Sequence, residues 1–193
     1  MKKQLILILF ASFFVLQIYP QVGSADISNA SSLYAKQKLD NWCWAACNQM
    51  LLSARDIEES QENQSIKVFG TIVNRGAGVN YELAKIGLRG TYQNSSGDTV
   101  RIVPYISYLS QRNNNDPIII IEHLDDGIPV VMATDQHGRV CVGVDYVKNG
   151  SYYEITKLRL LDPSQYGSAN IIEYTIQQLL QEGLIGFMTY NIR

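Results

Sequence analysis

Apolar residues recur at two different spacings along the chain, a helical spacing in the first half and a strand-like spacing in the second. The helical spacing is clearest over residues 41–54, where Asp40 or Asn41 can serve as the N-cap. Weaker helical patterns cover residues 60–73 and 81–88. The first half of the chain is therefore expected to form a helical layer.

Strand signals dominate from about residue 100 onward. Asn149-Gly150 lies between two alternating segments and is a strong hairpin turn. Residues 89–98 are rich in turn formers, and residues 171–181 mix helix and strand signals. The predicted strands cover residues 100–105, 128–134, 140–147, 151–161 and 186–192. Helices followed by an antiparallel sheet predict the α+β fold class.

A run of four isoleucines at residues 118–121 permits two interpretations. By composition alone the run favours a strand. However, Asp116-Pro117 is a good helix start, and the polar residues after the run can continue a helical turn before Gly127. We therefore expect a helix here.

The N-terminus has the order of a secretory signal. Two lysines follow Met1, then comes an apolar run over residues 5–18, and then small residues up to Ala25. This order predicts a signal peptide over residues 1–25 and one domain over residues 26–193, with a secreted or periplasmic location. A retained anchor is the alternative, but the apolar run is short for a membrane span. No other stretch approaches spanning length, so no membrane association is expected once the signal is removed.

Composition narrows the possible functions. Of the 193 residues 46% are hydrophobic and 18% are charged, which argues against disorder. Without the two N-terminal lysines, 14 basic residues remain against 18 acidic ones, so a nucleic-acid partner is not expected. Three cysteines are too few for a disulfide scaffold, and an odd number in an exported protein indicates a free thiol.

Cys43 is the candidate nucleophile among the three thiols. It falls in the first turn of the predicted helix over residues 41–54, where the helix dipole and unpaired N–H groups favour a thiolate. An unperturbed thiol has a pKa near 8.5 and is only a few per cent ionised at neutral pH, so a partner base is needed. The alternative is that Cys43 is an ordinary buried thiol.

Two histidines are available as that base. His137 lies between two predicted strands, where a rigid strand start can hold it at the edge of a cleft, and His123 lies in the expected helix. A cysteine–histidine pair also needs a group that orients the imidazole. Asp162 ends the strand that hairpins back beside the His137 strand and fits this role. Asp135 is a rival that requires a tight turn, and Asp145 is about 26 Å along the same strand, which is too far.

Gln37, Cys43 and the string Asn-Trp-Cys-Trp-Ala-Ala at residues 41–46 resemble the active-site helix start of papain-like cysteine peptidases. The fuller string is similar to the compact bacterial secreted and effector branch of that superfamily. Downstream, residues 124–131 resemble the segment before the catalytic-histidine strand of that branch, and residues 137–146 resemble the strand itself. Leu161-Asp162-Pro163 resembles the position of the third catalytic residue.

The resemblance implies a papain-like fold, with a helical layer carrying the cysteine packed on a sheet carrying the histidine. Cys43 would attack a carbonyl carbon, His137 would move the proton, Asp162 would hold the imidazole, and Gln37 would stabilise the oxyanion. The substrate would be a peptide or protein, and the enzyme would be a monomer. No metal or organic cofactor is expected.

One departure from the family pattern is Arg139, which places a charge two residues after His137 and predicts an exposed strand start. It motivates one alternative, a papain-like module that no longer catalyses and acts by binding or inhibition. Another alternative keeps the cysteine, histidine and aspartate but carries out transamidation or deamidation. The spacing of Cys47 and Cys141 also raises the possibility of a disulfide between helix and sheet, against two buried free thiols.

Overall fold

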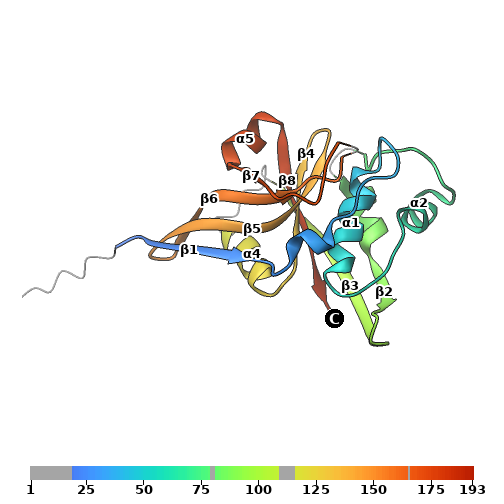
Figure 1. Ribbon diagram of the computed structural model, residues 1–193, viewed down its shortest axis with the longest axis horizontal. Coiled ribbons are helices and arrows are strands. Elements are labelled where there is room, and N and C mark those ends of the chain that lie inside the picture. Colours follow the sequence, from blue (N-terminus) through green and yellow to red (C-terminus); the bar gives the residue numbers. More distant parts are fainter. Residues whose placement is uncertain (1–18, 79–80, 109–115, 165) are drawn as a thin grey trace, which may run out of the picture.

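A large antiparallel sheet with helices on both of its faces forms the molecule, so the predicted α+β class is confirmed. The computed structural model describes residues 19–78, 81–108, 116–164 and 166–193. Strand order in the sheet is β2-β3-β8-β4-β5-β6-β7, and β1 pairs with β5 beside β4. Helices α1, α2 and α3 gather at one end of the molecule, and β1, β5 and β6 extend toward the other end (Figure 1).

The elements follow one another in chain order as helices and strands with these bounds. The helices are η1 (Ala30–Leu33, a 3-10 turn), α1 (Cys43–Ser53), α2 (Gln61–Phe69), α3 (Glu82–Leu88), α4 (Asp116–Asp125) and α5 (Ile176–Gln181). The strands are β1 (Gln21–Asp26), β2 (Gly90–Gln93), β3 (Thr99–Tyr108), β4 (Val130–Thr134), β5 (Gly138–Asn149), β6 (Tyr152–Leu161), β7 (Ile172–Tyr174) and β8 (Leu184–Ile192).

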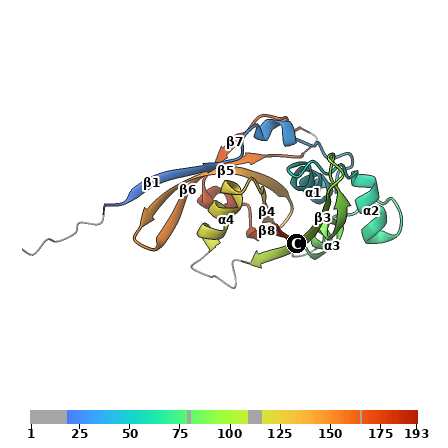
Figure 2. The same ribbon diagram turned by 90° about the horizontal axis from the view of Figure 1, so that it is seen from below.

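The sheet separates two apolar clusters, as the alternation of side chains along β4 shows. Val131 and Ala133 pack in the cluster that contains α1 and α3. Val130 and Met132 point to the opposite face, into the cluster that contains α4 and α5. Figure 2 shows α1, α2 and α3 together beside β3, and α4 apart from them. The candidate nucleophile therefore belongs to one face of the sheet only.

The start of α1 is set by tertiary contacts rather than by a capping side chain. The N-cap is Trp42, which makes no side-chain capping bond, so neither Asp40 nor Asn41 occupies the cap position that the pattern predicted. Instead, the indole N–H of Trp42 donates to the Val73 carbonyl at 2.7 Å. Two residues further on, the Trp44 indole donates to a carbonyl of the same loop at 3.0 Å. The helix begins where these two buried rings anchor the chain.

The isoleucine run is helical, as the Asp-Pro start predicted. It forms α4, and Ile120, Ile121 and Leu124 are buried against the sheet, as expected for one face of a helix. The turn-rich segment 89–98 was only partly correct as a prediction. Its second half is a turn, whereas its first half is strand β2, paired with β3.

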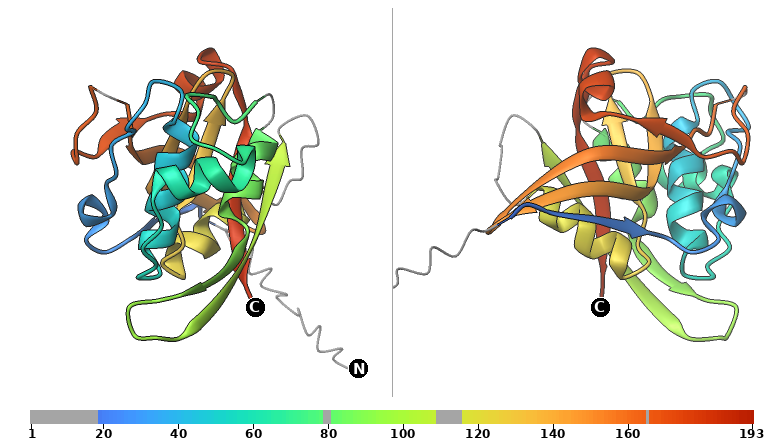
Figure 3. Two further views of the ribbon diagram at one scale, coloured as in Figure 1. Left: turned by 90° about the vertical axis from the view of Figure 1, so that its right-hand side faces the viewer. Right: turned by 60° about the vertical axis from the view of Figure 1, so that its left-hand side comes forward.

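The last strand of the chain lies in the interior of the sheet. β8 pairs with β3 on one side and with β4 on the other, whereas its sequence suggests only a closing strand. β5 has antiparallel neighbours on both edges. On one edge, β4 pairs with its first residues and β1 with its later residues. On the other edge it pairs with β6. The right panel of Figure 3 shows the blue β1 alongside the orange strands β5 and β6. Of these strands, β5 is the one that packs against α1.

The predicted signal peptide is described only in its final residues, because residues 1–18 lie outside the described part. Gln21 to Ala25 form most of β1, and Ala25 is buried in the α4 cluster. A cut after Ala25 would therefore remove five of the six residues of this strand from β5. Among the described helices none is long and apolar enough to cross a membrane.

Candidate active site

Cys43 is the first residue of α1 and is partly exposed between two buried tryptophans, Trp42 and Trp44. The backbone N–H groups of a first helical turn have no intrahelical acceptor and carry a partial positive charge. The sulfur therefore lies at a position that favours negative charge, as the sequence predicted.

His137 lies in the short connection between β4 and β5, and its backbone is held by one side chain. The Thr134 hydroxyl donates to the His137 carbonyl at 2.8 Å and accepts from the His137 N–H at 3.1 Å. The Thr134 N–H donates to the same carbonyl at 2.8 Å. Because Thr134 is buried at the end of β4, these bonds fix the imidazole relative to the sheet.

Asp162 follows β6 and reaches His137 because β5 and β6 pair at this end of the sheet. The Val140–Leu161 register places the residue after β6 beside the start of β5. His137 Nε2 and Asp162 Oδ1 are 2.8 Å apart. The same carboxylate oxygen accepts the Ser164 N–H at 2.8 Å, in a local turn that fixes the carboxylate.

The three predicted residues thus form one hydrogen-bonded row. With Nε2 of His137 bonded to Asp162, the other ring nitrogen is left for Cys43, and His137 and Cys43 are hydrogen-bonded. Two further donors reach the sulfur, the Gly138 N–H and the Tyr81 hydroxyl. The row joins the head of α1, the β4–β5 connection and the end of β6.

The row changes the acidity of each of its members. Burial raises the pKa of Cys43, but the hydrogen bond and positive charge of His137, together with the hydrogen bonds from Gly138 and Tyr81, outweigh burial, so the pKa of the thiol is lowered. Burial lowers the pKa of His137, while Asp162 and Cys43 raise it more strongly, to about 9. Burial raises the pKa of Asp162, but hydrogen bonds from His137 and Ser164 hold it well below its usual range. Both shifts favour the thiolate–imidazolium form of the pair over the neutral form.

Gln37, the predicted oxyanion donor, is close to this row through the backbone: its N–H donates to the Pro163 carbonyl at 2.7 Å. The side chain is buried, and its Nε2 donates to the carbonyls of Leu39 at 3.1 Å and Asp40 at 2.8 Å. Both N–H bonds of the amide are therefore directed at its own loop. In this conformation the amide has no N–H free to serve a developing oxyanion.

The rival residues lie away from the sulfur. His123, on α4, is hydrogen-bonded to the Ile119 carbonyl at 2.8 Å and to the Tyr105 hydroxyl at 3.3 Å. Asp145 accepts a hydrogen bond from Arg159 at 2.8 Å. Asp135 is exposed on the β4–β5 connection, and its carboxylate lies against Gly183. None of these three is a partner of the His137 ring.

Arg139 differs from what the sequence indicated. We expected it to make the strand start more exposed, but its side chain is only 12% exposed. Its Nε donates to Asp162 Oδ2 at 3.0 Å, and its guanidinium also pairs with Glu182 and lies over the Tyr174 ring. Arg139 therefore supplies a charged donor to the carboxylate that holds His137.

Cys47 and Cys141 are free thiols, so of the two alternatives the structure has the buried free thiols and not the disulfide. Both are buried, but Cys47 packs in the α1 cluster and Cys141 in the α4 cluster, on the other face of the sheet. The possibility of a disulfide depended on His137 and Cys141 lying on one face of a strand, but β5 begins only at Gly138, so the strand alternation does not extend to His137. Burial raises the pKa of Cys47 well above its ordinary value and that of Cys141 to about 12.

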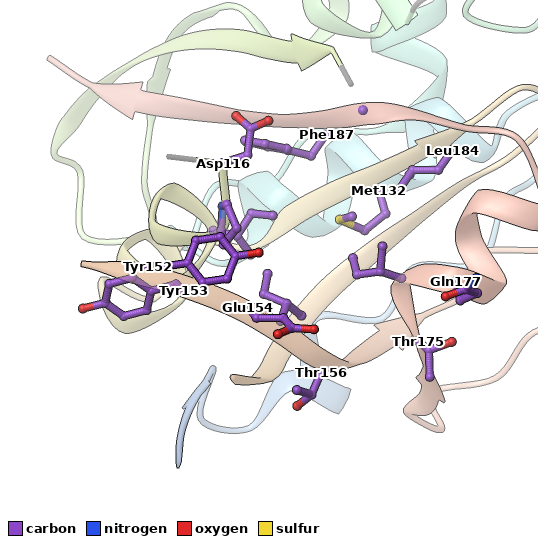
Figure 4. A pocket seen from close by; sticks show the side chains of 15 residues that line it. Asp116, Met132, Tyr152, Tyr153, Glu154, Thr156, Thr175, Gln177, Leu184 and Phe187 are labelled. Atoms are coloured by element: carbon purple, nitrogen blue, oxygen red, sulfur yellow. The ribbon is translucent and has the colours of Figure 1, made fainter. Parts of the chain in front are cut away.

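A cavity of about 590 Å³ lies on the opposite face of the sheet from Cys43. Figure 4 shows its floor of apolar side chains, which includes Met132, Leu184 and Phe187, and the acidic groups Asp116 and Glu154 at its rim. The lining residues do not include any member of the row. This cavity is therefore separate from the candidate active site.

No family model matches the sequence, and a search of curated proteins finds no significant match. Within the described ranges, no group of three or more His, Cys, Asp or Glu side chains is arranged to hold a metal ion. The hydrogen-bonded row of Cys43, His137 and Asp162 is therefore the main indication of function.

Proposed function

We propose that this chain is an exported cysteine peptidase of papain-like type, which hydrolyses peptide bonds through Cys43, His137 and Asp162. The observation that carries the proposal is the hydrogen-bonded row at the head of α1, with a thiol whose pKa is lowered and an imidazole whose pKa is raised to about 9. An ordinary buried thiol lacks such partners, as Cys141 on the other face illustrates. Perturbed groups that also meet in the right geometry are typical of catalytic sites.

In the first half of the reaction the Cys43 thiolate attacks the carbonyl carbon of the scissile bond. The carbonyl π electrons move onto the oxygen, and the N–H of Cys43, at the start of α1, is available to that oxyanion. When the intermediate collapses, the C–N bond breaks and the imidazolium of His137 gives its proton to the leaving amine. A thioester on Cys43 and a neutral imidazole remain.

In the second half a water molecule takes the place of the amine. The neutral His137 removes a proton from the water, whose oxygen attacks the thioester carbon. The C–S bond breaks, and the carboxylic acid product leaves with the sulfur restored as the thiolate beside the imidazolium. Asp162 stays ionised throughout, since its pKa is held below its usual range, and it keeps the ring oriented.

The layered arrangement agrees with the papain-like assignment. The candidate nucleophile starts a helix on one face of an antiparallel sheet, and the candidate base lies at the start of a strand of that sheet. The predicted signal order supports a secreted or periplasmic location, and a peptide or protein substrate follows from the chemistry. We further propose that the enzyme acts as a monomer and uses no cofactor.

The experiment that tests the proposal is labelling of Cys43 in the native protein by an epoxide that reacts with thiolates, read by peptide mass spectrometry. We expect labelling at Cys43 alone, together with hydrolysis of a peptide library. Cys43→Ala should lose both signals while keeping the melting temperature of the parent. Cys141→Ala is the matched control, because it removes a thiol from the other face and should keep both signals.

Two outcomes would reject the proposal. Absence of labelling at Cys43 in folded protein would indicate a binding module without catalysis. Labelling without hydrolysis of peptides, but with release of ammonia from glutamine substrates or transfer to amines, would indicate a deamidase or transamidase instead. The same thioester can be taken up by water or by an amine, so isopeptide and glutamine substrates belong in the screen.

A further inference from the structure

A buried phenol, that of Tyr81, is hydrogen-bonded to the sulfur of the candidate nucleophile. Tyr81 comes immediately before α3 and is only 5% exposed. Its ring also lies against the first residue of β5, since a Cβ added at Gly138 would come within 2.8 Å of the Tyr81 oxygen. The phenol is thus enclosed between α1 and β5, next to the His137 connection.

The backbone of Tyr81 is held in an uncommon conformation. Its φ is +57°, in the left-handed region that bulky side chains seldom adopt. Such a residue persists where the surrounding structure determines it, and such positions cluster at functional sites. Here the surroundings are α1 and α3: the Asn48 side chain donates to the Ala84 carbonyl at 2.8 Å, and Gly87 lies close against Trp44. The packing of α3 on α1 therefore aims the phenol at the sulfur.

In the hydrogen bond between Tyr81 and Cys43 the phenol is the donor and the sulfur is the acceptor. Burial raises the pKa of Tyr81 well above its ordinary value, and the neighbouring thiols Cys43 and Cys47 raise it further. The phenol therefore stays protonated and donates, while the sulfur accepts. The other charged or titratable groups that act on this pair are His137 at the sulfur, Asp162 behind the imidazole, and Arg139.

We propose that Tyr81 is a positioning residue for Cys43. The Tyr81 hydroxyl donates a hydrogen bond to the Cys43 sulfur, stabilises the thiolate and keeps it in line with His137. The proposal rests on the function proposed above and deepens it. Tyr81 is a second side-chain donor to the sulfur, besides His137. The Gln37 amide, by contrast, donates to carbonyls of its own loop. Tyr81 and the Gly138 N–H would hold the thiolate before substrate arrives.

A donor to a thiolate has a signature that a merely structural residue lacks. Losing it raises the thiol pKa, and it also makes the remaining thiolate more nucleophilic, because nucleophilicity rises with pKa with a Brønsted slope of about 0.4–0.5. A hydrogen bond to a charged group corresponds to about one pH unit in the pKa. Removal should therefore slow the reaction of Cys43 about threefold at pH values below its pKa and speed it about threefold well above.

The experiment is the pH profile of Cys43 alkylation by iodoacetamide in the full chain, followed by mass spectrometry. For Tyr81→Phe we expect the midpoint to move up by about one pH unit, with the two profiles crossing. Tyr190→Phe is the matched control: Tyr190 is also fully buried and donates to the Leu51 carbonyl of α1 at 3.1 Å, so its loss should leave the midpoint unchanged. Superimposable profiles of the parent and Tyr81→Phe would overturn the proposal.

A second variant covers the case in which Tyr81→Phe does not fold. Replacing Tyr81 with 3-fluorotyrosine keeps the ring and the hydroxyl but makes the phenol a stronger donor, so the midpoint should move down. An unmoved midpoint in that folded protein would equally overturn the proposal. Alkylation needs no substrate, so a parent that alkylates with a lowered midpoint but does not hydrolyse peptides would refute the proposed reaction and leave the role of Tyr81 to be decided separately.

Discussion

The two histidines occupy opposite faces of the same sheet, and both have their ring nitrogens engaged. His123 contacts a backbone carbonyl and a phenol, both within its own α4 surroundings. His137 contacts a carboxylate on one side and a thiol on the other, contributed by β6 and α1. The same side chain is thus a packed polar group in one place and a candidate base in the other. The difference lies in the partners that the fold brings to it.

The largest expected effect comes from exchanging the two histidines for glutamine, one at a time. His137→Gln should lower kcat/KM for peptide hydrolysis by about 10³–10⁴-fold, because it removes both the proton carrier and the charge that lowers the thiol pKa. His123→Gln should change it less than about twofold. Steady-state kinetics on the two folded variants checks this. Equal losses of kcat/KM in both variants would show that His137 has no role in the reaction that His123 lacks.

The next effect concerns the carboxylate that sets His137 apart. Activity requires the imidazolium, so it should fall as the pH rises through about 9, the pKa of His137. Asp162→Asn keeps the shape but removes the charge that raises that pKa, so the alkaline limb should move to lower pH and kcat/KM at neutral pH should fall about 10- to 100-fold. The kcat/KM profile between pH 5 and 10 measures both. An alkaline limb that stays in place would contradict the role given to Asp162.

A smaller effect is expected at Arg139, which bonds the same carboxylate from behind. Arg139→Gln should lower the free energy of unfolding by about 1–3 kcal/mol, because Asp162 and Glu182 each lose a charged donor. It should reduce kcat/KM about three- to tenfold through a less fixed His137. Arg159→Gln is the control, since Arg159 also pairs with two carboxylates, Asp26 and Asp145, but away from the sulfur. A loss of activity in both variants would point to general destabilisation instead.

The smallest expected effect is none at all. Adding a thiol reductant should leave the melting temperature unchanged, because Cys47 and Cys141 are free and face opposite sides of the sheet. A disulfide between them would contribute about 4–5 kcal/mol in the loop-entropy model. Differential scanning calorimetry with and without reductant, supported by alkylation of all three thiols in the unfolded, unreduced protein, distinguishes the two cases. A melting temperature several degrees lower with reductant than without it would indicate that Cys47 and Cys141 form a disulfide.

Much of the fold was accessible from local patterns. The helical spacing of apolar residues predicted α1 within two residues at its start and one at its end, and Asp116-Pro117 decided correctly for a helix in the isoleucine run. Both succeed because helix formation depends on residues three or four apart. The interior place of β8 could not be predicted, since its neighbours, β3 and β4, are distant in the sequence.

The site divides in the same way. Cys43, His137 and Asp162 were chosen from the residue types and their order along the chain, and the structure brings these three together. Local sequence patterns do not predict that Tyr81 contacts Cys43 or that Arg139 contacts Asp162. Tyr81 gave no signal beyond standing at the start of a predicted helix, and Arg139 was interpreted as an exposed charge.

The sequence by itself determined the α+β class, the helix that carries the thiol and the residue types needed for nucleophilic chemistry, because these follow from local spacing and composition. Tertiary structure decided which groups meet the sulfur and which do not. Strand register placed Asp162 and Arg139 beside His137, and the packing of α3 on α1 brought Tyr81 to Cys43. It also sent Cys141 to the other face, because the alternation of side chains starts only where β5 begins.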